Sequence, residues 1–284
     1  MKFLNTLEDD FPCPASSAID PRKYYDAFVK AEAILAKSPR RYRETADDRL
    51  AELTSFIYRG GDAAAALYRK SDDAPDVLID LWLSSVRRTA GWFIAANSVP
   101  TFEGLDETVY RGLPRQFKKA EDLPGINPYL ALHGIVFVWE EAFPSMKLDG
   151  AVFSLKSGHI VVALSLRYAR LDNFWFTLMH ELAHVVLHAD QLDRPILDDL
   201  DTESGSLIEK QADRLASDGL IPRNEWRSCA ARYTNSVGDI VNFAEKLGIP
   251  AQCVAGRLQR EQKRYDLFTE IINKYNVREI LNGS

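Results

Sequence analysis

The amino-acid sequence predicts an α+β fold that is mainly helical, in which a small β-sheet packs against one chemically distinctive helix. Three observations support this prediction. Apolar residues recur with helical spacing before residue 98 and after residue 236. Three short apolar segments between residues 134 and 166 have the character of strands. Directly after them, a helical pattern contains the motif H-E-x-x-H. With 284 residues, of which 46% are hydrophobic, the chain is long enough for one large domain or two modest ones.

A helical region is predicted first, over residues 1–115. Between Pro21 and Asn97 the apolar residues fall into three groups with helical spacing. These groups are Tyr25, Phe28, Val29, Ala33 and Leu35, then Leu50, Leu53, Phe56 and Ile57, then Val77, Leu78, Leu81, Trp82 and Val86. The basic run Pro39–Arg43 is interpreted as a solvated helix face, with a phosphate contact as the alternative. The proline-rich stretch Gly104–Pro128 marks the boundary to the next region.

The next elements are three short strands that form the predicted sheet. Gly134–Trp139 is the first apolar segment, and Ala151–Leu155 and His159–Leu166 are the other two. Lys156-Ser157-Gly158 connects the last two as a hairpin. The exposed edge of such a sheet can hold an extended peptide through backbone hydrogen bonds.

A buried helix follows the strands and carries the residues that constrain function most. Apolar side chains fill most other positions from Phe174 to Leu187. His180 and His184 are four positions apart, so they project from one face of a helix, about 6 Å apart along its axis, and can hold one cation. Glu181 can reach a water molecule on that cation as a general base without becoming a ligand. The alternative is a core helix whose two histidines bond to backbone carbonyls.

A zinc site in a hydrolase usually has three protein ligands, so a third ligand is expected. His188 lies on the same face as His180 but about 12 Å along the axis, too far for one ion. It is interpreted as a last-turn histidine and an outer partner of the site. Glu209, on a second predicted helix, is the preferred ligand, and Asp213 on the same face would accept the ring N–H of a ligating histidine. Alternatively, Ser206 and Glu209 form a capping box.

The remaining segments complete the predicted layout. The acidic stretch Asp190–Glu203 is interpreted as a solvated loop between the two ligand helices rather than as a second metal site. Val237–Asn282 is predicted to be helical again. The expected regions are therefore residues 1–115, a core over residues 116–236, and a helical C-terminal region over residues 237–284.

Bulk composition favours a cytoplasmic protein. A net charge of -6 and a pI near 5.5 make direct nucleic-acid binding an unlikely general property, because such binding depends on neutralising phosphates. The three cysteines have no paired spacing, which indicates a reducing compartment. Met1–Phe11 is charged and lacks the apolar segment of a signal peptide. The H-E-x-x-H helix is the most apolar stretch, but its imidazole and charged groups exclude a membrane span.

The motifs resemble those of the ImmA/IrrE metallopeptidases. These proteins carry H-E-[LI]-[GA]-H followed by Leu-His, which stand here as His180–His184 and Leu187-His188. They also carry E-x-x-A-x-x-[FL]-A, which stands here as Glu209–Ala216 with Leu215 in place of the more frequent Phe. Gly219 interrupts the end of the pattern. The resemblance extends over residues 132–261 and implies a zincin-like, gluzincin-type peptidase core with its small sheet packed on the H-E-x-x-H helix.

The expected activity is zinc-dependent peptide hydrolysis. Zinc would be held by His180, His184 and Glu209, and Glu181 would transfer the proton. A further group should stabilise the oxyanion. Tyr168 is preferred for this role because it lies just before the metal helix, and the other candidates are Arg167, His159 and Tyr233.

The resemblance also implies a partner, a helix-turn-helix transcriptional repressor whose cleavage controls a stress response or a mobile element. In relatives fused to such a regulator, a DNA-binding domain precedes the peptidase. The N-terminal third of this chain shows no pair of short helices around a glycine-containing turn, so that domain is missing or replaced. Two alternatives stay open. One is a non-catalytic, antitoxin-like interaction module with a structural metal site, and the other is a metal-dependent hydrolase of non-peptide substrates.

Overall fold

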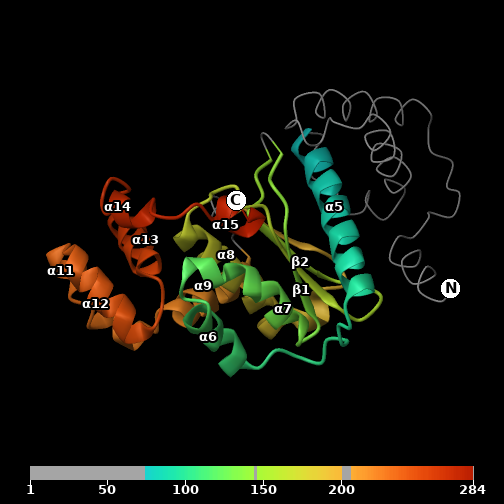
Figure 1. The fold of residues 1–284 in the computed structure, drawn as a ribbon, viewed down its shortest axis with the longest axis horizontal. Coiled ribbons are helices and arrows are strands. Elements are labelled where there is room, and N and C mark those ends of the chain that lie inside the picture. The colour runs from blue at the N-terminus through green and yellow to red at the C-terminus, as the bar shows by residue number, and fades with distance from the viewer. Residues whose placement is uncertain (1–73, 144–145, 200–205, 284) are drawn as a thin grey trace, which may run out of the picture. The chain divides into compact units, whose positions relative to one another are not determined.

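The computed structural model describes residues 74–143, 146–199 and 206–283 (Figure 1). These residues form a mainly helical α+β fold with a four-stranded mixed sheet, which confirms the predicted fold class. The chain divides into two compact units, residues 1–97 with 140–148 and residues 98–139 with 149–284. The first two predicted helical groups and the basic run at residues 39–43 lie outside the described residues.

The described part of the first unit is built on helix α5, Ala74–Ala96. Trp82 and Val86, from the third predicted apolar group, are fully buried. The Trp82 indole N–H donates to the carbonyl of Glu140 at 3.0 Å, and the Ser85 hydroxyl lies 3.2 Å from the Glu140 carboxylate. The helical spacing in this segment therefore predicted both the helix and its buried face.

The sheet of the second unit has the strand order β1-β3-β2-β4. The four strands are β1 Ile135–Trp139, β2 Gly150–Ser154, β3 Ile160–Leu164 and β4 Ile196–Asp198. Strand β1 is parallel to β3, and β2 is antiparallel to both β3 and β4. The predicted hairpin is present, since Leu155 N donates to His159 O at 2.8 Å and Gly158 has the positive φ of 83° that its turn requires.

Strand β4 corrects one interpretation, because it lies within the acidic stretch that was expected to be a solvated loop. Only two apolar residues, Ile196 and Leu197, precede Asp198 in this strand. Such a segment is too short to show the alternation by which a strand is recognised. Its strand conformation depends on pairing with β2, in which Asp198 lies opposite Gly150, 48 residues earlier in the chain. Strand pairing across such a separation left no local signal.

Helices cover the sheet and fill the rest of the second unit (Figure 1). Helix α8, Leu171–His188, lies against β2 and β3 and beside α9, Leu207–Leu220. The other helices are α6 Glu107–Gln116, η2 Ala120–Gly125, α7 Ile126–Ala131, η3 Ala189–Gln191, α10 Arg223–Arg227, α11 Ala231–Thr234, α12 Val237–Leu247, α13 Ala251–Gln262, α14 Thr269–Ile272 and α15 Val277–Asn282. Among the helices described, none is both long enough and apolar enough to cross a membrane.

Helix α8 is the centre of the core, as its apolar sequence predicted. Leu178, Met179 and Leu182 are fully buried, and Phe174 and Trp175 meet at a ring-centroid distance of 5.5 Å. Because α8 is apolar on nearly all sides, the sheet, α9 and α13 can enclose it together. The polar side chains of the H-E-x-x-H motif on this helix are therefore buried.

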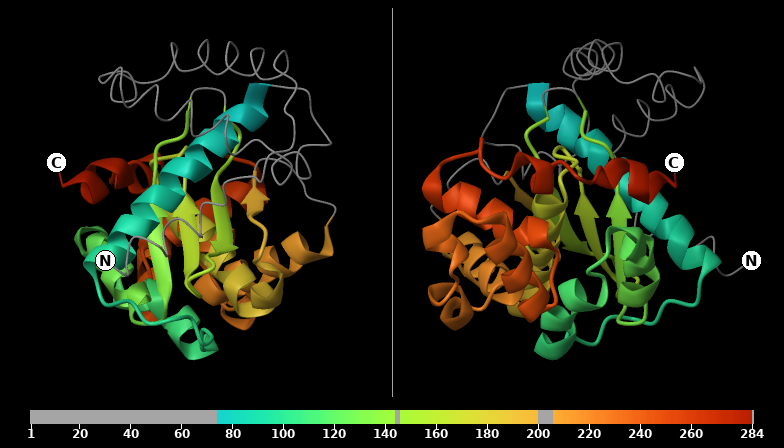
Figure 2. Two further views of the ribbon diagram at one scale, coloured as in Figure 1. Left: turned by 90° about the vertical axis from the view of Figure 1, so that its right-hand side faces the viewer. Right: turned by 60° about the vertical axis from the view of Figure 1, so that its left-hand side comes forward.

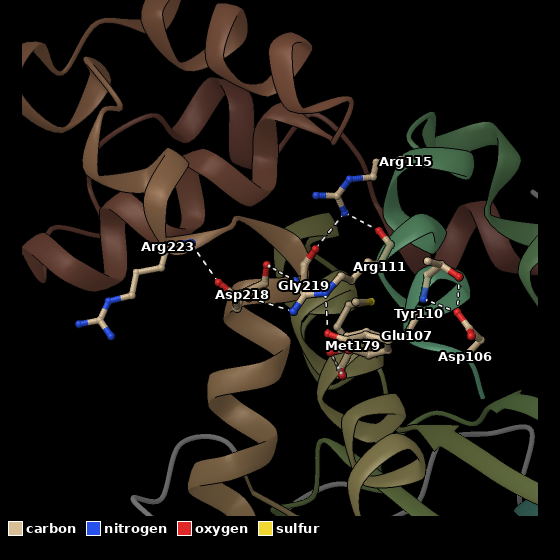
Figure 3. A network of polar contacts seen from close by, with 10 residues as sticks. Asp106, Glu107, Tyr110, Arg111, Arg115, Met179, Asp218, Gly219 and Arg223 are labelled. Carbon is tan, nitrogen blue, oxygen red and sulfur yellow. Dashed lines mark hydrogen bonds and ion pairs between the residues drawn. The ribbon is translucent and has the colours of Figure 1, made fainter. Parts of the chain in front are cut away.

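A polar clamp between α6 and the C-terminal end of α9 fixes these two helices against α8 (Figure 3). The Tyr110 hydroxyl donates to the carbonyl of Met179 on α8 at 2.9 Å. Arg111 forms an ion pair with Asp218 on α9 at 3.0 Å, and Arg115 donates to the carbonyl of the next residue of α9 at 2.9 Å. The clamp holds the C-terminal end of α9.

Candidate metal centre

Helix α8 presents two buried imidazoles on one face. His180 and His184 are at most 1% exposed, and their Nε2 atoms are 3.2 Å apart. Their spacing of four residues on a regular helix produces this arrangement. Neither ring uses its Nε2 to bond a backbone carbonyl among the hydrogen bonds described. The core-helix alternative required such bonds, and the described geometry does not contain them.

Helix α9 brings a carboxylate to the same point. Glu209, in the first turn of α9, places Oε2 3.2 Å from His180 Nε2 and 3.5 Å from His184 Nε2. Ser206 is the N-cap residue of α9 but makes no side-chain capping hydrogen bond. Glu209 is thus directed to the histidines and not to the helix end, so the capping-box alternative is not formed.

Asp198 is the fourth member of the cluster, and sequence reasoning missed it. Its side chain is 4% exposed, and Oδ2 lies 3.2 Å from His180 Nε2 and 3.6 Å from His184 Nε2. One ligand atom from each of His180, His184, Asp198 and Glu209 lies within 4.8 Å of every other. In the sequence, this aspartate is preceded only by the apolar pair Ile196-Leu197, which is too short to predict a strand.

The four groups fit a metal ion. Bonds of about 2.0–2.1 Å in tetrahedral geometry separate neighbouring ligand atoms by about 3.3–3.4 Å. The separations given above range from 3.2 to 3.6 Å. Within the described residues, Asp198 Oδ2 is buried without a hydrogen-bond partner. A buried carboxylate oxygen in this condition needs a positive charge nearby, which a metal ion supplies or, in its absence, a protonated imidazole. The cluster can therefore bind a metal, and its nitrogen and oxygen donors suit zinc.

Outer partners orient both imidazoles. His180 Nδ1 lies 3.0 Å from Asp213 Oδ1, which can only accept, so Nδ1 carries the proton and Nε2 is left for a metal. His188 Nε2 faces the side-chain amide oxygen Oε1 of Gln211 at 3.1 Å and donates to it. His188 Nδ1 then accepts from His184 Nδ1 at 3.2 Å. Asp213 and His188 thus lie where the sequence placed them as outer partners, and Gln211 was missed.

The carboxylates set the charge of the cluster. Burial opposes a charge on His180, but Asp198, Asp213 and Glu209 outweigh this effect and raise the pKa of His180 to about 12. The pKa of His184 is likewise raised by Asp198 and Glu209, against the effect of burial. Burial alone would raise the pKa of Asp198, yet the two imidazoles lower it far below its usual range. The site therefore has a strong preference for a positive charge, which a metal ion supplies.

Glu181 is fully buried beside this cluster. Both of its carboxylate oxygens lack a hydrogen-bond partner in the part of the chain that the structure describes. Burial, reinforced by the charge of Asp198, raises the pKa of Glu181 well above its ordinary value. A side chain at Gly150 would place Cβ only 2.0 Å from Glu181 Oε1, so the glycine on β2 makes room for the carboxylate. Glu181 is thus available to exchange protons with a bound molecule.

The candidate oxyanion-stabilising residues separate into two groups. Tyr168 is 42% exposed and lines a small recess with Arg167 and Thr177, on the side of α8 that precedes the motif. His159 instead bonds to Ser157 and to the carbonyl of Val99 at the hairpin end of β3, opposite the end where Leu164 pairs with Gly150. Its position just before β3 places it at the opposite end of that strand from Leu164, which pairs with Gly150 beside Glu181.

Tyr233 was also a candidate for stabilising the oxyanion, and it lies on helix α11. The side chain is 77% exposed and its ring contacts Arg232 at 5.7 Å. None of its described contacts reaches the cluster. Its sequence position after the second ligand helix gave no information on where α11 would pack, and no described contact supports this candidate.

Comparison with known proteins agrees with the motifs. Residues 133–259 match the family model Peptidase_M78, the IrrE N-terminal-like domain. This range runs from β1 into α13 and includes the whole cluster and Glu181. No curated protein matches the sequence.

Proposed function

We propose that this chain, which carries an ImmA/IrrE-type peptidase domain, is a zinc-dependent metalloendopeptidase. One observation supports this proposal most strongly. The imidazoles of His180 and His184 and the carboxylate of Glu209 meet at one buried point, and the unpartnered carboxylate of Glu181 lies beside it. Three ligands with an adjacent general base are the parts that zinc peptidases require.

The roles of the residues follow from their positions. His180, His184 and Glu209 would hold the ion, which when bound supplies a Lewis acid for the scissile carbonyl and for the attacking water. Glu181 removes the proton from that water and later delivers it to the leaving amine. Its burial suits it to both transfers, because a raised pKa brings a carboxyl group closer to neutral pH. Tyr168 is the proposed partner of the oxyanion.

The proposed substrate is a protein, and within that class a helix-turn-helix transcriptional repressor. Support for the narrower class comes from the resemblance of the motifs at residues 180–188 and 209–216 to ImmA/IrrE peptidases. Cleavage of such a repressor would release the genes of a stress response, a mobile element or a toxin–antitoxin system. Release by hydrolysis is irreversible, so a single active enzyme molecule could inactivate many repressor molecules.

A second candidate function is favoured by Asp198. Structural zinc sites are closed by four protein ligands, whereas catalytic sites keep one position open. The described cluster has four protein groups, which is the pattern of a structural site in a non-catalytic interaction module. Such a module would have no use for a fully buried, unpartnered carboxylate at Glu181, and this residue therefore favours the enzyme.

A cleavage assay separates the two candidates. Zinc-loaded protein is incubated with the product of a neighbouring repressor-like gene, and fragments are followed with time. We expect one defined cut by the wild type and a loss of about 10²- to 10⁴-fold in Glu181→Gln, since only the proton-transfer group is removed. Glu245→Gln, at an exposed position of α12, is the matched control. Binding of the repressor without cleavage under any metal or pH condition would favour the interaction module instead.

A further inference from the structure

We infer that strand β4 blocks the proposed catalytic site in the manner of a bound substrate. It lies along the edge of β2 where an extended peptide would pair, and it places Asp198 in the fourth position around the metal. This inference rests on the proposed function, since it describes how that same site is regulated.

The position of β4 is the first support. In the sheet order β1-β3-β2-β4, strand β2 would be the edge next to the metal cluster if β4 were absent. Figure 2 shows the short β4 at that edge of the sheet. It pairs antiparallel to β2 in the register Gly150↔Asp198 and Val152↔Ile196. A peptide that binds by strand addition needs this row of backbone groups, and the chain's own strand occupies it.

The position of Asp198 is the second, independent support. Strand pairing places Asp198 opposite Gly150, the residue over which Glu181 lies. Its Oδ2 atom is as close to His180 Nε2 as Glu209 Oε2 is, with 3.2 Å in both cases. A catalytic site with three protein ligands leaves its fourth position to water or substrate. Asp198 fills this position with a carboxylate beside the proposed general base.

Strand β4 is held in place by contacts at both ends. Asp149 N donates to the carbonyl of Asp198 at 2.7 Å, and Ser154 N donates to the carbonyl of Leu192 at 2.6 Å. Arg167 joins the two strands beyond the cluster, with ion pairs to Asp149 at 2.8 Å and to Asp199 at 3.1 Å. These contacts keep the carboxylate of Asp198 on the cluster in the resting protein.

The strand itself adds little apolar surface to the core. It has three residues, and its two apolar side chains, Ile196 and Leu197, are only partly buried, with Leu197 39% exposed. A strand with so little buried apolar surface opens at a lower free energy than the core strands do. A peptide that replaces β4 would restore the backbone pairing of β2. It would also bring a carbonyl to the place that Asp198 leaves, opposite Gly150.

The test measures access to the metal rather than hydrolysis. Cobalt(II) is loaded in place of zinc, and its visible spectrum is titrated with acetohydroxamate, a small metal ligand that needs an open position. We expect Asp198→Ala to bind acetohydroxamate at least about 10-fold more tightly than the wild type, because apparent affinity falls with the fraction of open protein. Asp193→Ala, an exposed aspartate of the same segment, is the matched control and should behave as the wild type.

Two further measurements make the outcome decisive. Asp198→Asn keeps the shape of the side chain but is a poorer ligand, so it should show the same direction of change if Asp198→Ala misfolds. Amide hydrogen exchange over residues 149–154 should accelerate in both variants as β4 leaves the edge. Equal acetohydroxamate affinity in the wild type and both Asp198 variants would overturn the blocking strand while leaving the metal site and the peptidase intact. Failure of the wild type to bind cobalt or zinc would overturn both the proposed function and the blocking role of β4.

Discussion

At the scale of single residues, His180 is the most constrained group of the site. Its ring lies between Asp213 on one side and Asp198 and Glu209 on the other. These carboxylates raise its pKa to about 12, so the ring is protonated at pH 7 when no metal is bound. A metal ligand must be unprotonated at the coordinating nitrogen, and therefore metal and proton compete for the same position.

This competition predicts a pH dependence of zinc binding. At pH 7 zinc should displace at least about one proton from the site, and the apparent affinity should rise with pH, because the folded pKa of His180 is far above 7. Calorimetric titrations in buffers of different ionisation enthalpy measure the number of protons released. An apparent zinc affinity that does not change between pH 6 and 8 would show that His180 does not carry the competing proton.

Asp213 supports His180 from outside the cluster, and its contribution can be measured separately. Its side chain is 54% exposed, so the hydrogen bond to His180 can be removed without disturbing the core. We expect Asp213→Ala to weaken zinc binding by about 10- to 100-fold without abolishing it. A competition titration with a chromophoric chelator gives the affinity, and Glu245→Ala serves as the surface control. Equal affinity in the two variants would reduce Asp213 to a helix-surface carboxylate.

The residues of the site differ in how far the sequence could predict them. His180, Glu181 and His184 are neighbours on one helix, where spacing alone fixes which side chains share a face. The prediction of Glu209 as a ligand required a second helix that packs beside the first. The spacing of four residues between Glu209 and Asp213 suggested such a helix. Asp198 depends on a strand pairing that no local pattern records, so it emerged only from the structure.

At the scale of elements, the packing of α8 against α13 depends on a glycine. A Cβ at Gly256 on α13 would lie 2.1 Å from Asp172 Oδ2 at the start of α8. Asp172 is itself held by Arg170 at 2.7 Å, and Arg170 also donates to Gln259 on α13 at 2.8 Å. The Asp172 carboxylate therefore cannot move aside without breaking the contact between α8 and α13.

This contact gives a stability prediction with a matched control. Gly256→Ala should lower the free energy of unfolding by about 1–3 kcal/mol, because overpacking outweighs the helix propensity that alanine adds. Gly112→Ala on α6 meets nothing within 4 Å and should instead gain up to about 1 kcal/mol. Urea unfolding of both variants and the wild type measures these differences in the free energy of unfolding. A stabilised Gly256→Ala would mean that α8 and α13 pack more loosely than described.

Helices and strands could be predicted where the local sequence pattern alone determines the structure. The apolar stretch of α8 and the hairpin of β2 and β3 each have a local pattern. The two strands lie within two residues of the expected bounds, and α8 begins three residues before the expected Phe174. Strand β4 has no such pattern, because its position is set by pairing with β2. This explains why the acidic stretch was expected to be a loop.

At the scale of the whole molecule, the order of the apolar patterns predicted a mainly helical α+β fold. The described residues form this fold. The matched family domain at residues 133–259 coincides closely with the range over which the motifs were recognised. The identity of the substrate and the role of the N-terminal residues could not be predicted, because they depend on contacts with partners that composition does not encode. The proposed function depends on the cluster of His180, His184, Asp198 and Glu209, which could hold a metal ion.

Metal content tests this site most directly. The wild-type chain and Glu209→Ala are purified under the same conditions and dialysed against a weak chelator, and zinc is quantified by elemental analysis, with Glu245→Ala as the control. We expect about one zinc per chain in the wild type and in the control, and none in Glu209→Ala, because two histidines without the carboxylate cannot complete a tight site. A wild-type chain that retains no zinc, or a Glu209→Ala chain that retains it fully, would contradict the proposed zinc site.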